Sequence, residues 1–278
     1  MMKCPICGTT DLKYLFSGED NLFDRKGAYD ILFCKLCKLG ISKIDYHQEY
    51  FAAAYPNEYY TEVLRVQRTN DITGQLQMLG TKDSAKDKKI LEIGCAAGDV
   101  LAALARQGAR VTGVEPNPYA AALASEKNVP VYRSIEDVKE RDFDVIILFD
   151  TLEHMPDPLK TLSWVREHLA AAGTAILSFP NFASLEARML RQRWFALELP
   201  RHLFHFTPNA VKTLALHSKM KLRKIKYIYS SFFLKSFFDE RLKKRPKLPI
   251  LKKRVFAPFE VALYILGNRP YMVAYLGK

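Results

Sequence analysis

Four of the five cysteines form two matched pairs near the start of the chain. Two residues separate Cys4 from Cys7, and two separate Cys34 from Cys37. This spacing lets one turn present two thiolates to a single ion, so two such turns complete the four sulfur ligands that Zn²⁺ prefers. Reduced structural thiols or a redox-active pair are the alternatives. We predict a structural zinc site, because four protein ligands leave the ion no open position for chemistry.

A second candidate site follows a short apolar segment, where residues 89–100 read KILEIGCAAGDV. Glu92 precedes Gly94 and Gly98, whose spacing suits a tight turn but differs from the GxGxxG pattern of a dinucleotide-binding turn. Glu115 ends the next apolar segment, where its carboxylate could accept hydrogen bonds from both hydroxyls of a ribose. This set predicts a site for a nucleoside that carries an amino acid rather than phosphates.

Three histidines are candidates for a general base, a role that imidazole often fills near neutral pH. His154 follows the apolar segment at residues 144–150, and His202 and His205 lie in LPRHLFHFTPNAV at residues 199–211, a loop before a helix predicted to be capped by Thr207 with Pro208 in its first turn. The aromatic residues of this loop suit the wall of a substrate pocket. A buried structural histidine bonded to a backbone carbonyl is the alternative for each of the three.

These candidate residues need a scaffold, and strands and helices are predicted in alternation to provide it. The apolar strand candidates occupy residues 89–94, 110–115, 129–133, 144–150 and 174–180. Helices capped at Asn117 and Asp157 lie between them, each with proline at the next position. The second is expected to run to Leu169 and to be ended by Ala171, Ala172 and Gly173. The alternation predicts an α/β fold with a doubly wound, Rossmann-like parallel sheet, which binds ligands at the carboxyl ends of its strands.

In this order the motifs resemble those of the class I S-adenosylmethionine-dependent methyltransferases, over roughly residues 50–220. The resemblance implies S-adenosylmethionine as cofactor, with its methionine end on the acid and glycines of the turn and its ribose on Glu115. It places the adenine near Glu136 and Asp137, and the segment DTLEH, residues 150–154, beside the methionine moiety and the substrate. The implied cofactor residues are Glu92, Gly94, Cys95, Gly98, Glu115, Pro116, Glu136, Asp137 and Asp150.

One residue departs from the family pattern, because Ala96 stands where the central glycine of the turn is usual. A methyl group strains a turn that requires positive φ, although alanine is small enough to fit an ordinary conformation. A degenerate fold that binds no cofactor is the alternative, and the intact Glu92, Glu115 and DTLEH segment argue against it.

Residues 180–211 resemble a methyltransferase subgroup of sugar, polysaccharide and natural-product pathways that also carries an N-terminal four-cysteine zinc module. Aligned on HLFHFT, the histidine base of the deoxysugar C-methyltransferases in this subgroup falls on His202, and their glutamate falls on Arg201. The resemblance therefore implies His202 as the base, with His154 and His205 as further candidates, and leaves the role of the acid unfilled.

The sequence divides into four predicted parts. We expect a zinc-ribbon module at residues 1–45, a helical bridge and cofactor cover at 46–88, the methyltransferase domain at 89–230 and a basic-aromatic C-terminal extension at 231–278. The bridge should contain an amphipathic helix from Thr61 whose apolar face includes Leu76 and Leu79.

The net charge of +12 is concentrated in Lys212–Arg254, which holds fifteen Lys or Arg and two acids. One local basic stretch predicts one anionic contact, such as the surface of an anionic membrane. That contact would suit a lipid-linked acceptor, with a sugar, glycolipid or other small molecule as the substrate class. Lysines covering apolar surface are the structural alternative, and a ribosomal-RNA methyltransferase and a non-catalytic zinc-ribbon adaptor are the functional ones. No signal-peptide pattern and no membrane-length apolar run occur, so we expect a cytoplasmic protein with peripheral membrane contact.

Overall fold

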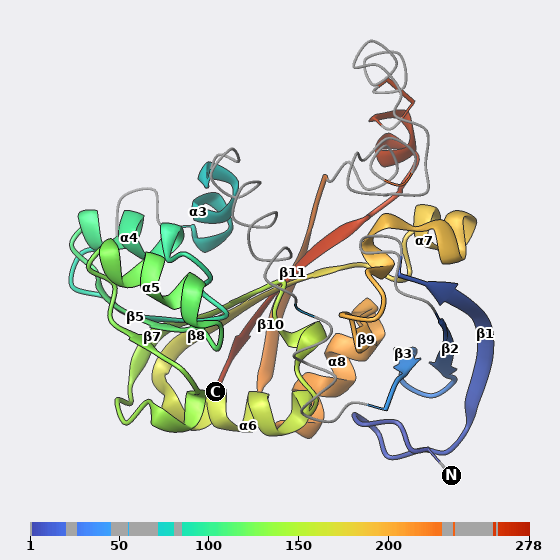
Figure 1. Cartoon of the computed structure of the whole chain (residues 1–278), viewed down its shortest axis with the longest axis horizontal. Helices are drawn as coiled ribbons and strands as arrows, with labels where there is room; N and C mark the ends of the chain where they lie inside the picture. The colour runs from blue at the N-terminus through green and yellow to red at the C-terminus, as the bar shows by residue number, and fades with distance from the viewer. Residues whose placement is uncertain are drawn as a thin grey trace.

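A computed structural model describes residues 2–20, 27–45, 55, 72–80, 85–229, 236, 258–259 and 261–278. Within these residues the predicted α/β fold is confirmed as a seven-stranded, mostly parallel sheet with helices on both faces (Figure 1). A second sheet of four strands lies beside it, and the turns that carry the two cysteine pairs adjoin this sheet.

The large sheet has the strand order β10-β11-β8-β7-β4-β5-β6. Six of the seven strands run in the same direction, and β11 runs antiparallel between β8 and β10. Their bounds are β4 (Lys89–Ile93), β5 (Arg110–Val114), β6 (Val131–Tyr132), β7 (Phe143–Phe149), β8 (Leu169–Pro180), β10 (Lys221–Ile228) and β11 (Tyr271–Gly277). Strand β11 lies within residues 231–278, which we predicted to be a C-terminal extension. This segment therefore contributes a strand to the large sheet.

Helices cover both faces of this sheet. On one face α3 (Thr73–Leu79), α4 (Asp99–Arg106) and α5 (Pro118–Glu126) pack on an apolar cluster with β4 and β7 residues. On the other face α6 (Pro158–His168) and α8 (Pro208–His217) pack on a second cluster, and Figure 1 shows these two helices below the sheet. Helix α3 carries Leu76 and Leu79 of the predicted amphipathic helix, whose first part lies outside the described residues.

The predicted helix caps are confirmed. Asn117, Asp157 and Thr207 each accept a hydrogen bond from the backbone N–H three residues ahead, and each precedes a proline in the first turn. Helix α6 ends one residue earlier than expected, however, because Leu169 already pairs with Phe143 as the first residue of β8. Residues 170–173 then form an irregular start to the strand rather than a helix stop, and Gly173 has no room for a side chain because a Cβ would lie 2.8 Å from the Phe143 carbonyl oxygen.

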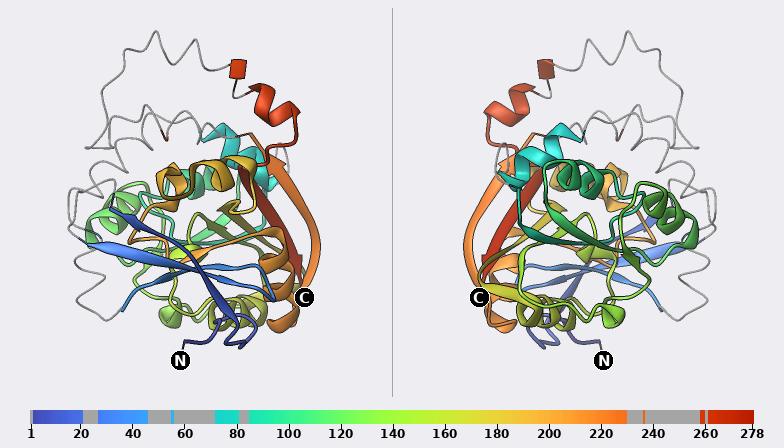
Figure 2. Two further views of the ribbon diagram at one scale, coloured as in Figure 1. Left: turned by 90° about the vertical axis from the view of Figure 1, so that its right-hand side faces the viewer. Right: turned by 90° about the vertical axis from the view of Figure 1, so that its left-hand side faces the viewer.

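The small sheet has the order β1-β2-β3-β9, with β1 (Leu12–Glu19), β2 (Ala28–Cys34), β3 (Gly40–Lys43) and β9 (Phe204–His205). Its last strand belongs to the loop before α8, and Gly40 pairs with His205. Figure 2 shows β1 and β2, in blue, beside the large sheet. The module is therefore tied by backbone pairing to the loop that carries two of the candidate histidines.

Candidate functional site

The turn after β4 requires a left-handed backbone. Gly94 and Gly98 have φ of 77° and 70°, and Cβ atoms there would lie 2.5 Å from Thr151 Oγ1 and 2.8 Å from Ala124 Cβ. Ala96 also has positive φ, 47°, so it does not adopt an ordinary conformation. The left-handed region costs an alanine roughly 1–2 kcal/mol, and the turn retains this strain. Glycine is thus needed at both flanking positions for steric reasons as well as for φ.

Glu92 is buried behind this turn, with 4% of its surface exposed. Its Oε2 has no hydrogen-bond partner among the described residues. Burial, reinforced by the nearby carboxylates of Asp99 and Glu115, raises the pKa of Glu92 to about 8. A buried acid without a partner is costly for a fold to keep, and a cationic ligand would both pair with it and restore its charge.

Glu115 lies at the end of β5 with its carboxylate fixed toward the same turn. Its two oxygens accept hydrogen bonds from the backbone N–H groups of Ala96 at 3.0 Å and Asn117 at 2.8 Å. Burial raises its pKa despite these bonds. Each carboxylate oxygen has a second lone pair, so the group keeps acceptors for two hydroxyls, and this pair of acceptors fits a ribose.

The other implied cofactor residues surround this centre. Cys95 is buried where a Cβ on Gly113 would lie 2.6 Å from its sulfur, so it packs against β5, and burial raises the pKa of its thiol. The carbonyl of Pro116 accepts a hydrogen bond from Arg133. Glu136 and Asp137 lie exposed in a short 3₁₀ segment after β6, and a hydrogen bond from Ser134 lowers the pKa of Glu136.

Asp150 stands at the end of β7 with positive φ, 47°. Its carboxylate accepts a hydrogen bond from the hydroxyl of Tyr271, which lies 2.6 Å from both oxygens, and Ser178 Oγ is 2.7 Å from the same hydroxyl. Sequence reasoning missed Tyr271 because it lies 121 residues away along the chain. Tyr271 comes close to Asp150 because its strand, β11, pairs with β8.

The candidate bases His154 and His202 lie together, with ring centroids 4.6 Å apart. His202 Nδ1 lies 3.0 Å from the carbonyl oxygen of Ala196, and its Nε2 lies 3.7 Å from Glu198 Oε2. His154 Nδ1 lies 2.8 Å from the hydroxyl of Tyr55. Burial lowers the pKa of His202, and burial beside His202 lowers that of His154 to about 3. Both imidazoles are therefore neutral near pH 7, and the low pKa makes His154 a weak proton acceptor.

His205 has a different environment from the other two. Its Nε2 lies 3.0 Å from Ser42 Oγ in the small sheet, and its ring centroid is 6.3 Å from that of His202. Burial lowers its pKa well below the usual range. The ring of His205 thus contacts a side-chain hydroxyl, whereas His202 and His154 each lie near a backbone carbonyl, as the structural alternative expects: His202 Nδ1 is 3.0 Å from the Ala196 oxygen and His154 Nδ1 is 3.1 Å from the Arg201 oxygen.

Two acids near the histidines were missed from sequence. Glu198 precedes His202 by four residues, and its Oε2 lies 3.7 Å from His202 Nε2. Glu153 is 1% exposed, and neither of its oxygens has a partner among the described residues. Burial, then the charge of Asp150, raises the pKa of Glu153 well above the usual range. Both acids lie in segments already singled out, so their spacing from the histidines was the available signal.

Arg201 does not stand in for the missing acid. Its guanidinium is wholly buried, donates to Asp20 at 3.0 and 3.3 Å, and lies 3.4 Å from Glu198 Oε1. Asp20 follows β1, so this ion pair joins the small sheet to the histidine loop. Arg201 therefore orients the loop and holds Glu198 near His202.

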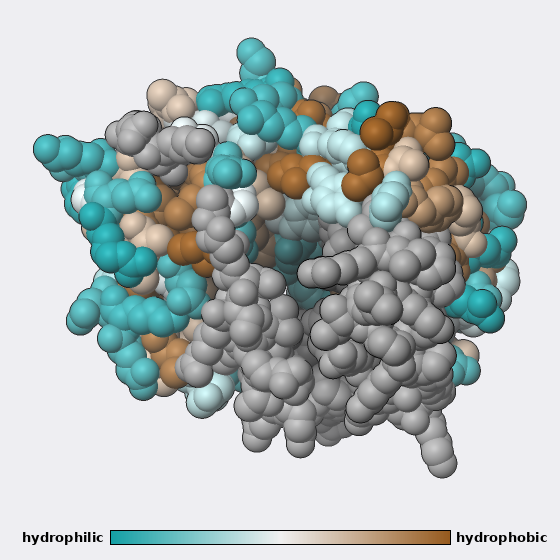
Figure 3. All heavy atoms as spheres, turned by 90° about the horizontal axis from the view of Figure 1, so that it is seen from above, coloured by the Kyte–Doolittle hydropathy of each residue, from teal (hydrophilic) through white to brown (hydrophobic). Residues whose placement is uncertain are grey.

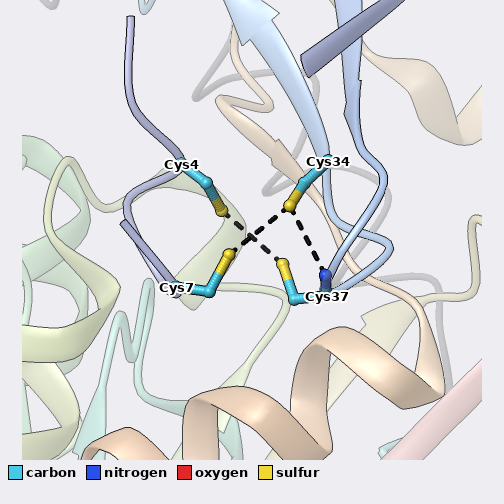
Figure 4. A group of neighbouring side chains, drawn as sticks. All are labelled: Cys4, Cys7, Cys34 and Cys37. Atoms are coloured by element: carbon cyan, nitrogen blue, oxygen red, sulfur yellow. Dashed lines mark hydrogen bonds between the residues drawn. The ribbon is translucent and has the colours of Figure 1, made fainter. Parts of the chain in front are cut away.

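The four predicted metal ligands gather at one point (Figure 4). Their sulfurs lie within 4.8 Å of one another, with Cys4 to Cys37 and Cys7 to Cys34 both at 3.5 Å. A tetrahedral Zn²⁺ with sulfurs at about 2.3 Å separates them by about 3.8 Å, so the thiols already have nearly the required arrangement. The backbone N–H of Cys37 donates to Cys34 Sγ at 3.4 Å, which steadies one ligand.

The chain is similar to known proteins in both sequence and structure. A family model described as a methyltransferase domain matches residues 64–218, more than half of the chain. This chain belongs to the methyltransferase family. Similar solved structures of this family include S-adenosylmethionine-dependent methyltransferases from Thermotoga maritima (TM-score 0.55, 17% identity, 82% of this chain and 98% of that one) and Mesorhizobium loti (TM-score 0.52, 12% identity, 73% and 96%).

Relatives with higher sequence identity match only part of this chain. Ubiquinone biosynthesis O-methyltransferases from Actinobacillus pleuropneumoniae and Xanthomonas campestris are 37% and 29% identical over 117 and 144 residues, or 37% and 48% of this chain. The match spans about half the length of the curated relatives, 50% and 60% for these two. None of the helices among the described residues is long and apolar enough to cross a membrane.

Proposed function

We propose that this protein transfers the methyl group of S-adenosylmethionine to a small-molecule acceptor. The observation that carries the proposal is the buried, unpartnered carboxylate oxygen of Glu92 behind a glycine turn that has no space for side chains. When bound, the cofactor supplies a methyl group on a sulfonium and an ammonium group that fits this acid. Glu115 would hold the ribose, and the exposed Glu136 and Asp137 would border the adenine.

The remaining cofactor contacts follow from position. Cys95 and Pro116 would line the turn through their backbones, because the thiol is packed against β5. Asp150, held by Tyr271, would border the methionine end and the entry of the acceptor. Seen from above, the molecule is hollowed near its centre, with hydrophilic residues in the hollow (Figure 3). We propose that the acceptor enters through this hollow.

For the acceptor we infer a hydroxyl group on a sugar or lipid-linked molecule. The similarity to ubiquinone biosynthesis O-methyltransferases supports a hydroxyl acceptor. Such a group needs close, in-line placement, which alone accounts for roughly 7–11 kcal/mol of barrier reduction. It also loses a proton, which the neutral His202, beside Glu198, or His154 would accept.

We further propose that Zn²⁺ binds Cys4, Cys7, Cys34 and Cys37 and serves a structural role. The near-tetrahedral set of sulfurs supports this assignment, and it offers the ion no fifth protein group for catalysis. We also propose that Lys212–Arg254 contacts an anionic membrane, since Lys224 and Lys226 lie exposed on the edge strand β10. Co-sedimentation with phosphatidylglycerol vesicles that is lost in high salt tests this contact.

Labelled S-adenosylmethionine tests the main proposal when it is incubated with the protein and a cell extract. We expect label in small molecules, and a loss of about 10² to 10⁴-fold in turnover for His202→Ala or His154→Ala. His217→Ala, an exposed position at the end of α8, is the control and should retain full activity. Unchanged turnover in both variants contradicts the base assignment. Label in RNA instead supports a ribosomal-RNA enzyme, and no cofactor binding at millimolar concentration supports an adaptor.

A further inference from the structure

A cavity of about 570 Å³ lies between the small sheet and the helices α7 (Leu185–Leu190) and α8. Its walls come from β1, β2 and the second cysteine turn on one side and from the segment after β8 and the two helices on the other. The volume is in the range of sites for drug-sized molecules. None of the residues assigned above to cofactor, base or metal lines it.

The cavity combines an aromatic floor with a cationic rim. Phe16, Phe33 and Phe182 supply apolar surface, whereas Lys38, Arg188 and Arg191 supply positive charge, and no acid is among the described residues that line it. Arg191 is fixed in the wall, because it donates to the Leu15 carbonyl at 2.7 Å and its guanidinium lies 5.2 Å from the ring of Phe16. Arg188 and Lys38 are exposed and can meet a ligand.

The inner wall of this cavity adjoins the catalytic edge of the sheet. Phe182 follows β8 by two residues, and its ring centroid lies 5.1 Å from that of His205. His205 in turn lies beside His202. The packed rings of Phe182 and His205 therefore lie between the cavity and the candidate base.

We infer that the cavity binds a phosphate group joined to an apolar or planar body, as the anchor of the methyl acceptor. The assignment to the acceptor rests on the proposed function, whereas the binding itself does not. Three cations beside a low-dielectric floor attract an anion more strongly than they would in open solvent. Inorganic phosphate would leave the floor uncovered, and a neutral apolar ligand would leave the cations unmatched. Both a lipid phosphate and a nucleotide sugar have the required chemistry.

Calorimetry with farnesyl phosphate and with UDP-glucose distinguishes the two sources. We expect one of them to bind saturably below millimolar concentration and at least ten times more tightly than inorganic phosphate. Arg188→Glu should weaken this binding tenfold or more, and Lys38→Gly should weaken it too while suiting the positive φ of 66° at that position. Arg106→Glu, at the exposed end of α4, is the matched control and should bind as the wild type does.

Three results would overturn the inference: no saturable binding of either probe, equal binding by wild type and Arg188→Glu, or inorganic phosphate binding as tightly as both probes. S-adenosylmethionine binding is measured on the same preparation. Cofactor binding without probe binding removes only this inference, whereas probe binding without cofactor binding removes only the proposed function.

Discussion

The cysteine module and the cofactor edge of the large sheet treat buried polar groups in opposite ways. In the module four thiols converge on one another within 4.8 Å, and a single ion would satisfy all of them at once. At the sheet edge Glu92 and Glu153 are buried with oxygens that have no partner among the described residues. The first arrangement favours a fixed structure, and the second keeps groups available for a ligand.

This difference predicts which property a substitution in each region should change. A closed metal site contributes to folding outright, so its loss should appear as loss of structure. An unpartnered buried acid lowers stability, so its removal should leave the fold intact and appear as loss of binding. Substitutions in the two regions should therefore separate effects on stability from effects on ligand affinity.

The largest effect is expected from Cys37→Ser, which removes one of the four sulfurs. Structural zinc contributes an apparent 10–16 kcal/mol, roughly, in small zinc-dependent folds, so the small sheet should lose both its metal and its cooperative melting. Metal analysis and thermal unfolding measure this outcome. Cys95→Ser, outside the cluster, should keep about one zinc per chain. Equal zinc content in the two variants would refute the four-cysteine site.

The ion pair that joins the two regions should have the next largest effect. Arg201→Met leaves Asp20 buried without its main cation, which typically destabilises a protein by about 3–5 kcal/mol. Adding Asp20→Leu should recover most of this loss, and denaturant unfolding measures both variants. Lys35→Met is the control, because its pair with Asp11 at 2.9 Å is exposed and should contribute about 1 kcal/mol or less. A loss of similar size in the control would argue against the buried pair.

The turn after β4 gives a smaller effect of opposite signs at neighbouring positions. Gly94→Ala places a methyl group 2.5 Å from Thr151 Oγ1 at positive φ, so we expect a loss of stability of about 2 kcal/mol or more, together with weaker cofactor binding. Ala96→Gly relieves an existing strain and should be neutral or stabilising by up to about 1 kcal/mol. Thermal unfolding of both variants measures the difference. A destabilising Ala96→Gly would show that the methyl group there makes contacts that outweigh its strain.

Much of this arrangement could be predicted because local sequence signals and global fold agree. Helix caps at Asn117, Asp157 and Thr207 and the glycines of the turn act over a few residues, and the structure confirms the caps and the need for glycine. The position of β11 in the sheet could not be predicted from the sequence. It depends on pairing with β8 and β10 rather than on the residue pattern of the strand itself.

The same distinction explains the site. The four cysteines were predictable from spacing alone, whereas the partners Tyr271 and Asp20 lie 121 and 181 residues from the groups that they bind. The positive φ of Ala96 could not be predicted either, because alanine, unlike glycine, does not indicate a left-handed conformation. Local chemistry was therefore legible in the sequence, and the residues that orient it became evident only through tertiary contacts.

The pH dependence of S-adenosylmethionine binding follows from the raised pKa of Glu92. In the free folded protein this pKa is about 8 against an ordinary 4.5, so stability present at low pH is lost as the pH rises through about 8. Binding of a cation has the opposite sign, because it favours the carboxylate and releases the proton. Affinity should therefore rise with pH by up to about tenfold per unit between roughly pH 6 and 7.5.

Calorimetric titration of the protein with S-adenosylmethionine across this range tests the central claim most directly, with Glu92→Gln as the comparison and Glu126→Gln on α5 as the control. We predict saturable binding by the wild type and the control that strengthens with pH. Glu92→Gln should bind about 10 to 100-fold more weakly, with little pH dependence, because a charged hydrogen bond is lost. Binding by Glu92→Gln with the affinity and pH profile of the wild type would contradict the account.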